Sequence, residues 1–424
     1  MKTNNTIPMG RTRWRRLLSF FVIGAYRVVS LPAAAPVEME HVVLHRDDTM
    51  YYLGPSLAVL PDGDILMGLR EAHARSREMR GHVDPASRGV FLRSRDGGRS
   101  FGEKRVIDDE TMHFSSSQDT TLTVLADGSI LAGIYSWGIV PVPTGVALSK
   151  IHTGKKMVGA EKPFIGIFEG MWTRHSTDEG LTWTERRPVD VAGLPPLGGR
   201  AQVVELEDGT MLMQVNDLSR SVGQPRDWAR VFCLRSTDGG VTWGEPALVA
   251  EGSDLTVHFL EPSLVRLRSG RLISMLRTRG EGPGADERVK NEGDDIGSLY
   301  SHYGHVFQSV SDDDGRTWSE RVETPMWGFP AHVLELSDGR LLCAYGYRRP
   351  PFGVRATLSY DGGETWDIAN EIVVRDDGGT SDLGYPVSIE LPDGRVLMAY
   401  YFNQETSEDP ESITRYIAGT FLEL

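Results

Sequence analysis

Carboxylates, phenols and guanidinium groups stand at fixed distances from one recurring turn in this chain. The turn is Asp-Gly between two apolar runs, and these side chains stand nine residues before its glycine or seven residues after it. They are Asp119, Arg200, Glu261 and Tyr385 before the turn, and Arg70, Tyr135, Arg277 and Tyr401 after it. Charges brought together in this way are costly unless they pair with one another or with a ligand. The pattern therefore indicates a pocket for an anionic ligand or, alternatively, a self-neutralising ion network.

These residues need a scaffold that brings distant segments to one place. An Asp-Gly turn between apolar runs predicts a β-hairpin, because its glycine takes the positive φ of a tight turn. Five Asp-Gly turns and one Ser-Gly turn place the glycines at Gly63, Gly128, Gly209, Gly270, Gly339 and Gly394. Six hairpins predict six blades of a β-propeller, whose first strands line a central channel. Residues at one offset from the turn would then meet at one end of that channel.

A second repeat supports the same fold. Ser-x-Asp-x-Gly-x-Thr-Trp or a near variant occurs at 94–101, 176–183, 236–243, 311–318 and 359–366. Such a repeat along a whole chain is typical of stacked supersecondary units. We expect each box to link strands three and four of a blade, with its Asp binding turn amides and its Trp packing between sheets. The sequence thus predicts an all-β, six-bladed propeller with Asp-box repeats.

The two ends of the repeat predict how the ring closes. No box follows the last hairpin, and the chain ends on one more strand-like run, Ile413 to Leu422. The last blade therefore has three strands of its own, and His41 to His45 could supply the fourth. An N-terminal strand in the last blade would leave no free sheet edge. Because no linker separates a second unit, residues 37–424 are predicted to form one propeller domain.

Residues 1–36 are interpreted as a signal peptide. Four arginines, the last pair being Arg15 and Arg16, precede an apolar run from Leu17 to Tyr26, and an Ala-rich stretch follows as a cleavage region. The run is shorter than the ~20 residues of a membrane span. We therefore expect a secreted or periplasmic protein without stable membrane insertion, exported by either the general or the twin-arginine route.

Composition excludes several other classes. A formal net charge of −14 argues against nucleic acid or an acidic membrane surface as the main partner. The two cysteines, Cys233 and Cys343, fall in non-adjacent blades, which predicts two buried thiols in place of a disulfide. The chain lacks Cys/His clusters with zinc spacing and a Gly-rich phosphate loop, so neither a metal nor a cofactor is expected.

The boxes and the six hairpins resemble the sialidase superfamily over essentially the whole chain after the leader. The stretches Tyr345–Pro351 and Asp382–Pro386 look like those of a bacterial sialidase-like subgroup. The resemblance implies that Tyr385 is a nucleophile, with Glu261 as its partner carboxylate and Arg277 as a substrate-binding arginine. A phenol with a pKa of about 10 needs such a base to take its proton. A neutral phenol also suits an anomeric carbon that carries a carboxylate.

The resemblance also implies a general acid and two further arginines. In the family, the acid is an Asp in the loop between strands two and three of blade one. Asp84 is the single Asp in that loop here, and His82 is the alternative candidate for the acid. Arg348, or its neighbour Arg349, matches the third arginine of the family's carboxylate site. Leu53 stands in the position of the first arginine.

Arg70, Arg200, Asp119 and His82 complete the predicted substrate-binding set. Arg70 and Arg200 are expected to reach the same end of the channel as Glu261. Their charges favour an anionic substrate even though the family's first arginine is missing. The sequence therefore predicts an exo-acting glycoside hydrolase that releases a terminal acidic sugar, sialic acid or a related one, from a glycan. Two alternatives stay open: a non-catalytic glycan-binding propeller, and a hydrolase or lyase directed at uronic acids.

Overall fold

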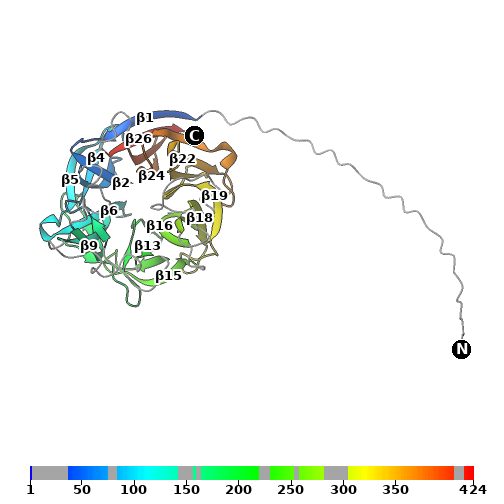
Figure 1. The fold of residues 1–424 in the computed structure, drawn as a ribbon, viewed down its shortest axis with the longest axis horizontal. Coiled ribbons are helices and arrows are strands. Elements are labelled where there is room, and N and C mark those ends of the chain that lie inside the picture. The colour runs from blue at the N-terminus through cyan, green and yellow to red at the C-terminus, as the bar shows by residue number, and fades with distance from the viewer. Residues whose placement is uncertain are drawn as a thin grey trace. The chain divides into compact units, whose positions relative to one another are not determined.

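A computed structural model of the chain describes Met1 and residues 37–74, 84–141, 156–158, 164–218, 230–252, 257–280, 304–404 and 415–424. Apart from Met1, the predicted signal peptide lies outside the described residues. Val37–Leu424 form one compact unit, in which six antiparallel sheets are arranged around a central axis (Figure 1). The six-bladed all-β propeller predicted from the hairpins is confirmed.

Blades one to three follow each other along the chain. Blade one consists of β2 (Met50–Val59), β3 (Ile65–His73), β4 (Arg88–Ser94) and β5 (Gly102–Asp108). Blade two consists of β6 (Ser115–Val124), β7 (Ile130–Pro141), β9 (Phe164–Ser176) and β10 (Arg187–Pro188), with β8 (Lys156–Val158) paired to β9. Blade three consists of β11 (Leu197–Gly198), β12 (Val203–Glu205), β13 (Met211–Asp217), β14 (Val231–Ser236) and β15 (Gly244–Ala250). The innermost strand of blade three is thus divided in two.

Blades four to six complete the ring. Blade four consists of β16 (Val257–Arg266), β17 (Leu272–Gly280), β18 (His305–Ser311) and β19 (Val322–Trp327). Blade five consists of β20 (Ala331–Glu335), β21 (Leu341–Tyr347), β22 (Phe352–Ser359) and β23 (Ile372–Gly378). Blade six consists of β24 (Gly384–Glu390), β25 (Val396–Phe402), β26 (Tyr416–Glu423) and β1 (Glu38–His45). Two short 3₁₀ helices, η1 (Thr111–His113) and η3 (Ile368–Asn370), lie in connections.

The last blade takes its outer strand from the beginning of the domain. β1 pairs antiparallel with β26, from Glu38 opposite Glu423 to His45 opposite Ile417. This agrees with the fourth strand predicted at His41 to His45, although the strand begins three residues earlier. The first and last strands of the domain therefore share one sheet.

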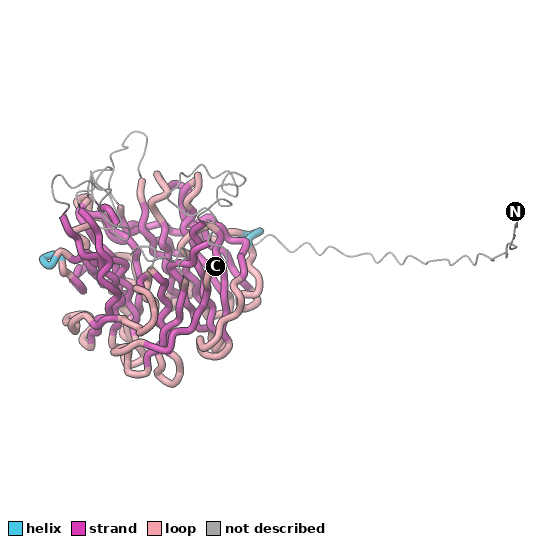
Figure 2. The backbone as a smooth tube through the Cα atoms, turned by 60° about the horizontal axis from the view of Figure 1, so that its bottom comes forward, coloured by secondary structure: helices cyan, strands magenta, loops and turns pink. Residues whose placement is uncertain are grey.

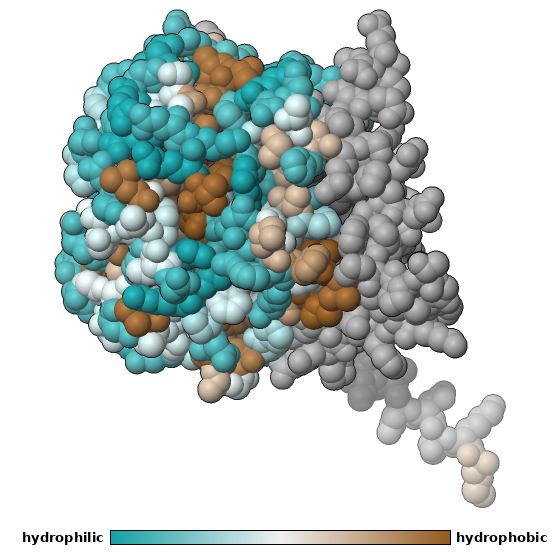
Figure 3. Space-filling view, turned by 90° about the vertical axis from the view of Figure 1, so that its left-hand side faces the viewer, coloured by the Kyte–Doolittle hydropathy of each residue, from teal (hydrophilic) through white to brown (hydrophobic). Residues whose placement is uncertain are grey.

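Apolar side chains between neighbouring blades form the core. Each of the six main clusters joins two adjacent sheets; one unites Leu57 and Met67 of blade one with Leu397 and Phe421 of blade six. The strands run between two ends where the loops collect (Figure 2). In the face shown in Figure 3, apolar residues form small groups among hydrophilic ones. The core thus follows the ring and leaves the axis to other side chains.

The boxes are structural, as their turn chemistry predicts. In the second box, Asp178 accepts hydrogen bonds from the Thr182 amide at 2.9 Å, the Thr182 hydroxyl at 2.6 Å and the Ser176 hydroxyl at 2.8 Å. Gly180 has φ +83°, and a Cβ there would lie 2.7 Å from the ring of Phe91 in the preceding blade. The second box turn therefore needs glycine both for its conformation and for its close approach to the preceding blade. Cys233 and Cys343 are both buried and free, as predicted.

Candidate active site

The same irregularity interrupts the innermost strand of four blades. Strand pairing shifts between Leu53 and Ser56, Gln118 and Thr121, Leu260 and Ser263, and Gly384 and Val387. Each interruption contains one residue with positive φ: Gly54 (62°), Asp119 (37°), Glu261 (40°) and Tyr385 (52°). A bulge of this kind re-aims a side chain, and positive φ is strained for residues other than glycine. The offset found in the sequence therefore marks a specialised backbone position at one end of the axis.

Tyr385, Glu261 and Arg277 form a hydrogen-bonded group at this end. The Tyr385 hydroxyl donates to Glu261 Oε1 at 2.8 Å, and Arg277 Nη1 donates to Glu261 Oε2 at 2.6 Å. Arg277 Nη1 also lies 3.3 Å from the Tyr385 oxygen. Tyr385 and Arg277 are buried, with exposed fractions of 5% and 8%. The three residues come from β24, β16 and β17, so the ring fold alone brings them together.

The electrostatics of this group keep the proton on the phenol. Burial and then the neighbouring Glu261 carboxylate raise the pKa of Tyr385 well above its ordinary value. Burial alone would raise the pKa of Glu261, but the Arg277 guanidinium outweighs it and leaves the pKa below its ordinary value. Without substrate the site therefore holds a neutral phenol hydrogen-bonded to a carboxylate. The Tyr385 oxygen can become a nucleophile only by passing its proton to Glu261 as a new bond forms.

Two further arginines lie against the Tyr385 ring. The Arg200 and Arg348 guanidinium carbons lie 5.4 Å and 5.5 Å from its centroid. Arg348 donates to the Leu383 carbonyl at 3.0 Å and to the Tyr401 hydroxyl at 3.1 Å. Arg200 donates to the carbonyl of Pro55 in blade one. The predicted arginines of blades three, four and five thus lie around the phenol.

Phe329 supports two of these cations and was not singled out in the sequence. The guanidinium carbons of Arg277 and Arg348 lie 4.5 Å and 5.0 Å from its ring centroid. Arg349, the alternative to Arg348, instead stacks on Trp327 at 3.5 Å. Arg348 is therefore the member of the pair that faces the phenol. Phe329 directly precedes Pro330, the blade-five residue at the offset of Glu261 and Tyr385, and this adjacency was the available signal.

Asp119 and Arg70 complete the charged end of the axis. Asp119 is buried and accepts a hydrogen bond from the Tyr135 hydroxyl at 3.2 Å. Burial raises the pKa of Asp119, and this effect outweighs the opposing charge of Arg200. Arg70 is fully buried, donates from Nε to the Ser87 hydroxyl at 2.8 Å and lies over the Tyr51 ring at 5.5 Å. Asp119 is therefore a buried carboxyl group with a pKa above its ordinary value, placed at the same end of the axis as Glu261.

The predicted general acid lies in the loop before β4, which also contains Ser87, the hydrogen-bond partner of Arg70. Asp84 is buried; its Oδ1 accepts a hydrogen bond from the Ala86 amide at 2.8 Å, and its carbonyl accepts one from the Ser87 amide at 3.0 Å. Ser87 in turn accepts the Nε bond of Arg70. Asp84 is thus attached to the charged end through the backbone of one turn, and its role as acid stays a prediction. His82, its competitor, lies outside the described residues.

A carboxylate that sequence reasoning did not assign connects these groups. Asp382 accepts hydrogen bonds from Tyr51 at 3.0 Å, Tyr401 at 3.1 Å and Arg415 Nε at 2.8 Å. Tyr401 also accepts from Arg348, so one network extends from blade one to blade five. Tyr51 and Arg415 stand at neither offset from a turn glycine. The sole sequence signal was the position of Asp382 three residues before Tyr385.

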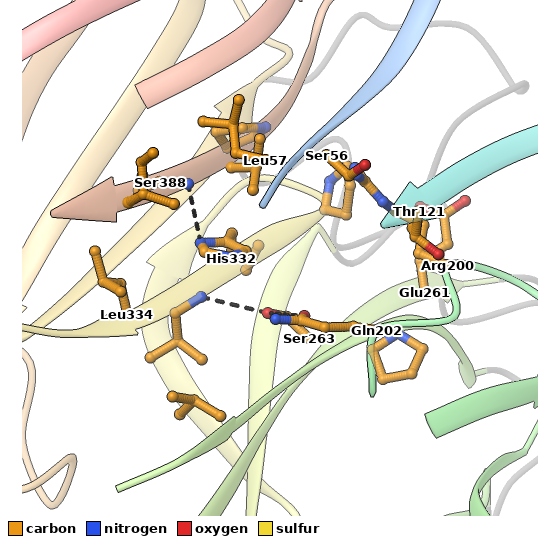
Figure 4. Close-up of a pocket in the computed structure, with 18 of the residues that line it drawn as sticks. Ser56, Leu57, Thr121, Arg200, Gln202, Glu261, Ser263, His332, Leu334 and Ser388 are labelled. Atoms are coloured by element: carbon orange, nitrogen blue, oxygen red, sulfur yellow. Dashed lines mark hydrogen bonds between the residues drawn. The ribbon is translucent and has the colours of Figure 1, made fainter. Parts of the chain in front are cut away.

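Below the charged end, a cavity of about 220 Å³ follows the axis. Arg200 and Glu261 lie at one side of it (Figure 4). Its polar lining comprises Ser56, Thr121, Gln202, Ser263, His332 and Ser388. These side chains connect blades: Ser263 accepts from the Val333 amide at 3.3 Å, and His332 Nδ1 from the Ser388 amide at 3.3 Å. Burial, with a smaller effect of Arg200, lowers the pKa of His332 to about 3, so this ring is neutral.

In the part of the chain that the structure describes, no group of His, Cys, Asp and Glu could hold a metal ion. The same residues contain no helix long and apolar enough to cross a membrane.

Sequence comparison relates the chain to a family and to one curated protein. The family of the BNR repeat-like domain matches residues 151–398. A sialidase from Micromonospora viridifaciens is 22% identical over 419 residues, which cover 91% of this chain and 58% of the sialidase. The chain thus spans little more than half the length of that relative. The resemblance to sialidases drawn from the boxes and hairpins is confirmed.

Several solved structures share the fold. A protein of unknown function from Dyadobacter fermentans has a TM-score of 0.72 and 28% identity over 92% of this chain and 99% of its own. The NanB sialidase from Streptococcus pneumoniae has a TM-score of 0.60 and 12% identity over 95% and 73%. An alpha-L-arabinanase from Penicillium chrysogenum has 0.59 and 13% over 90% and 97%. The fold is therefore that of sialidase-like glycoside hydrolases. Because proteins of one fold act on different substrates, the fold does not identify the sugar, and that question depends on the residues of the site.

Proposed function

Because the chain belongs to the family of the BNR repeat-like domain, we propose that it is an exported, exo-acting glycoside hydrolase that releases a terminal acidic sugar, sialic acid or a related one. The observation that carries this proposal is the buried group of Tyr385, Glu261 and Arg277, joined by bonds of 2.8 Å and 2.6 Å to the carboxylate. One end of the channel thus offers a phenol, a base and several cations. This combination suits the terminal, negatively charged sugar of a glycan chain. The predicted leader in residues 1–36 supports export.

In the first step, the Tyr385 oxygen attacks the anomeric carbon while its proton passes to Glu261. The bond from that carbon to the leaving oxygen breaks, and Asp84 donates a proton to this oxygen. A covalent glycosyl-tyrosine results. The positive charge of Arg277, 3.3 Å from the phenolic oxygen, stabilises the negative charge that develops there during attack.

In the second step, water attacks the same carbon from the face that the leaving group vacated. Asp84, now ionised, takes a proton from the water, and the bond to Tyr385 breaks. Glu261 returns its proton to the phenolic oxygen. Two displacements on opposite faces retain the configuration of the sugar. Asp119, Arg200 and Arg348 are assigned to binding, because each lies at this end of the axis and makes no bond to the Tyr385 hydroxyl among the described contacts.

A second candidate is a non-catalytic propeller that binds acidic glycans. The observation that favours it is Leu53, which stands in the position of the family's first arginine and is buried in an apolar cluster. Such a protein would keep the cations without turnover. A hydrolase for uronic acids differs from the first candidate only in the sugar, so the same experiment addresses it. A uronic-acid lyase would instead cleave by elimination and leave an unsaturated sugar.

The test is fluorescence release from 4-methylumbelliferyl glycosides of N-acetylneuraminic acid and of glucuronic and galacturonic acids. We expect the protein to release the fluorophore from one of them and Tyr385→Phe to reduce that rate by at least ~10³-fold. Binding of an acidic sugar without turnover of any glycoside would establish the binding propeller. Turnover of a uronide alone would assign the uronic-acid reaction.

A further inference from the structure

The position opposite Leu53 is occupied by an arginine. In the register of β2 and β3, Leu53 pairs directly with Arg70. Cross-strand partners project on the same face of a sheet, so Arg70 shares its face with Leu53 and with Tyr51, two residues earlier. The Arg70 guanidinium indeed lies over the Tyr51 ring. Blade one therefore presents a cation from its second strand at the place where its first strand presents an apolar side chain.

Most of the hydrogen-bonding capacity of Arg70 is unused. Nε donates to Ser87 at 2.8 Å, whereas the terminal nitrogens Nη1 and Nη2, which carry four of the five N–H groups, are buried and have no hydrogen-bond partner among the described residues. A buried guanidinium without a carboxylate is among the most costly groups that a protein can contain. Buried donors without acceptors are rare in proteins, and a ligand that supplies the acceptors would account for those of Arg70.

The carboxylates nearby make their hydrogen bonds to other groups. Asp382 accepts hydrogen bonds from the Tyr51 hydroxyl, Arg415 and Tyr401. Asp119 accepts its hydrogen bond from Tyr135, and Arg70 acts on it through charge, which lowers the pKa of Asp119 less than burial raises it. Nη1 and Nη2 of Arg70 therefore remain without an acceptor among the described residues.

We propose that Arg70 binds the carboxylate of the substrate through Nη1 and Nη2, in a forked pair of hydrogen bonds. A planar guanidinium matches a carboxylate in this way, and lysine does not. Ser87 fixes the orientation of the fork by holding Nε, and Tyr51 supports its face. Arg70 thus selects sugars with a carboxylate over neutral ones. This inference deepens the proposed function and rests on it for the identity of the substrate as a sugar.

The test measures binding, so that it does not depend on turnover. Isothermal titration calorimetry is carried out with N-acetylneuraminic acid, D-glucuronic acid and the methyl esters of both. The wild-type protein should bind one acid at least 10-fold more tightly than its ester. Arg70→Met should weaken binding of that acid about 10- to 100-fold and of its ester less than about 3-fold, because only the acid makes charge-assisted bonds. Arg70→Lys, which keeps the charge without the fork, should fall between them.

Arg235→Met serves as the matched control. Arg235 is a buried arginine at the end of β14, immediately before the third box. This end of the strand is the one opposite to the charged end of the axis. Its replacement should change neither affinity. The proposal is overturned if Arg70→Met weakens acid and ester equally, if it changes neither, or if the wild-type protein binds neither acid. Acid binding that depends on Arg70, without hydrolysis of any glycoside, would uphold the carboxylate site and refute the proposed reaction.

Discussion

Replacement of Glu261 by glutamine removes the negative charge that holds Arg277 and Tyr385 together. Arg277 is 8% exposed, so water cannot take the place of the carboxylate that now lies 2.6 Å away. Loss of one partner from a buried ion pair costs about 3–5 kcal/mol, and we expect about 3 kcal/mol because glutamine keeps an acceptor oxygen. The unit Val37–Leu424 should unfold with an entropy of about 0.8 kcal/mol/K. The Tm of Glu261→Gln should therefore fall by about 4 °C at pH 7.

The pH dependence of this difference has a definite sign. The pKa of Glu261 is lower in the folded protein than its ordinary value of 4.5, because Arg277 outweighs burial. A depressed pKa contributes stability that is present above the unfolded pKa and is lost as the pH falls through the folded one. The gap in Tm between wild type and Glu261→Gln should thus be full at pH 7 and shrink below about pH 4.5.

The assay is thermal unfolding followed by near-ultraviolet circular dichroism at pH 7, 5, 4 and 3.5. Glu364→Gln is the matched control, since Glu364 also lies 2.6 Å from an arginine, Arg271, but is exposed. An exposed pair contributes about 0–1 kcal/mol, so its Tm should change by about 1 °C or less. A Glu261→Gln protein as stable as wild type at pH 7, or a gap as large at pH 3.5 as at pH 7, would show that Arg277 does not depend on the charge of this carboxylate.

Three further variants separate catalysis from folding. Tyr385→Phe keeps the ring between Arg200 and Arg348, so Tm should stay within about 2 °C while intact-mass spectrometry of quenched reactions detects a glycosyl adduct on wild type alone. Asp84→Ala should lower kcat/KM about 10²- to 10⁴-fold for an alkyl glycoside and less than about 10-fold for a nitrophenyl glycoside, and equal losses would exclude an acid role. Asp313→Ala removes the acceptor of two Thr317 bonds and should lower Tm by several degrees with unchanged kcat/KM. The pKa of Asp313 is about 2, chiefly because Thr317 donates to it, so its contribution to Tm should disappear as the pH falls from 3.8 towards 2.

The repeating features of the fold could be read from the sequence because each rests on local chemistry. The six turn glycines have φ between 81° and 92°, which is what an Asp-Gly hairpin requires. Equal spacing from those turns then located Asp119, Glu261 and Tyr385, since strands of equal length end at the same height on the axis. The division of the first strand of blade three around Arg200 was not predicted, because that strand has no local signal for a break.

The remainder of the site depends on contacts between distant segments. The bond from Tyr51 to Asp382 joins residues 331 positions apart, and neither stands at a repeated offset. Arg415 enters the network from the residue directly before β26, and no turn glycine stands at a repeated offset from it. Arg70 stands at a repeated offset, but that its terminal nitrogens lack hydrogen-bond partners among the described residues depends on how side chains from several blades pack around it. Contacts between such distant segments form only when the six blades close into a ring.

The bulge that recurs in blades one, two, four and six has a consequence for the evolution of propellers. The same bulge occurs in four blades and places a glycine, an aspartate, a glutamate and a tyrosine at one end of the axis. Because strand pairing resumes two residues later in each copy, an exchange of side chain there leaves the pairing of the blade unchanged. Duplication of a blade thus supplies a spare position for chemistry, and a new reaction can arise by point substitution without a new fold.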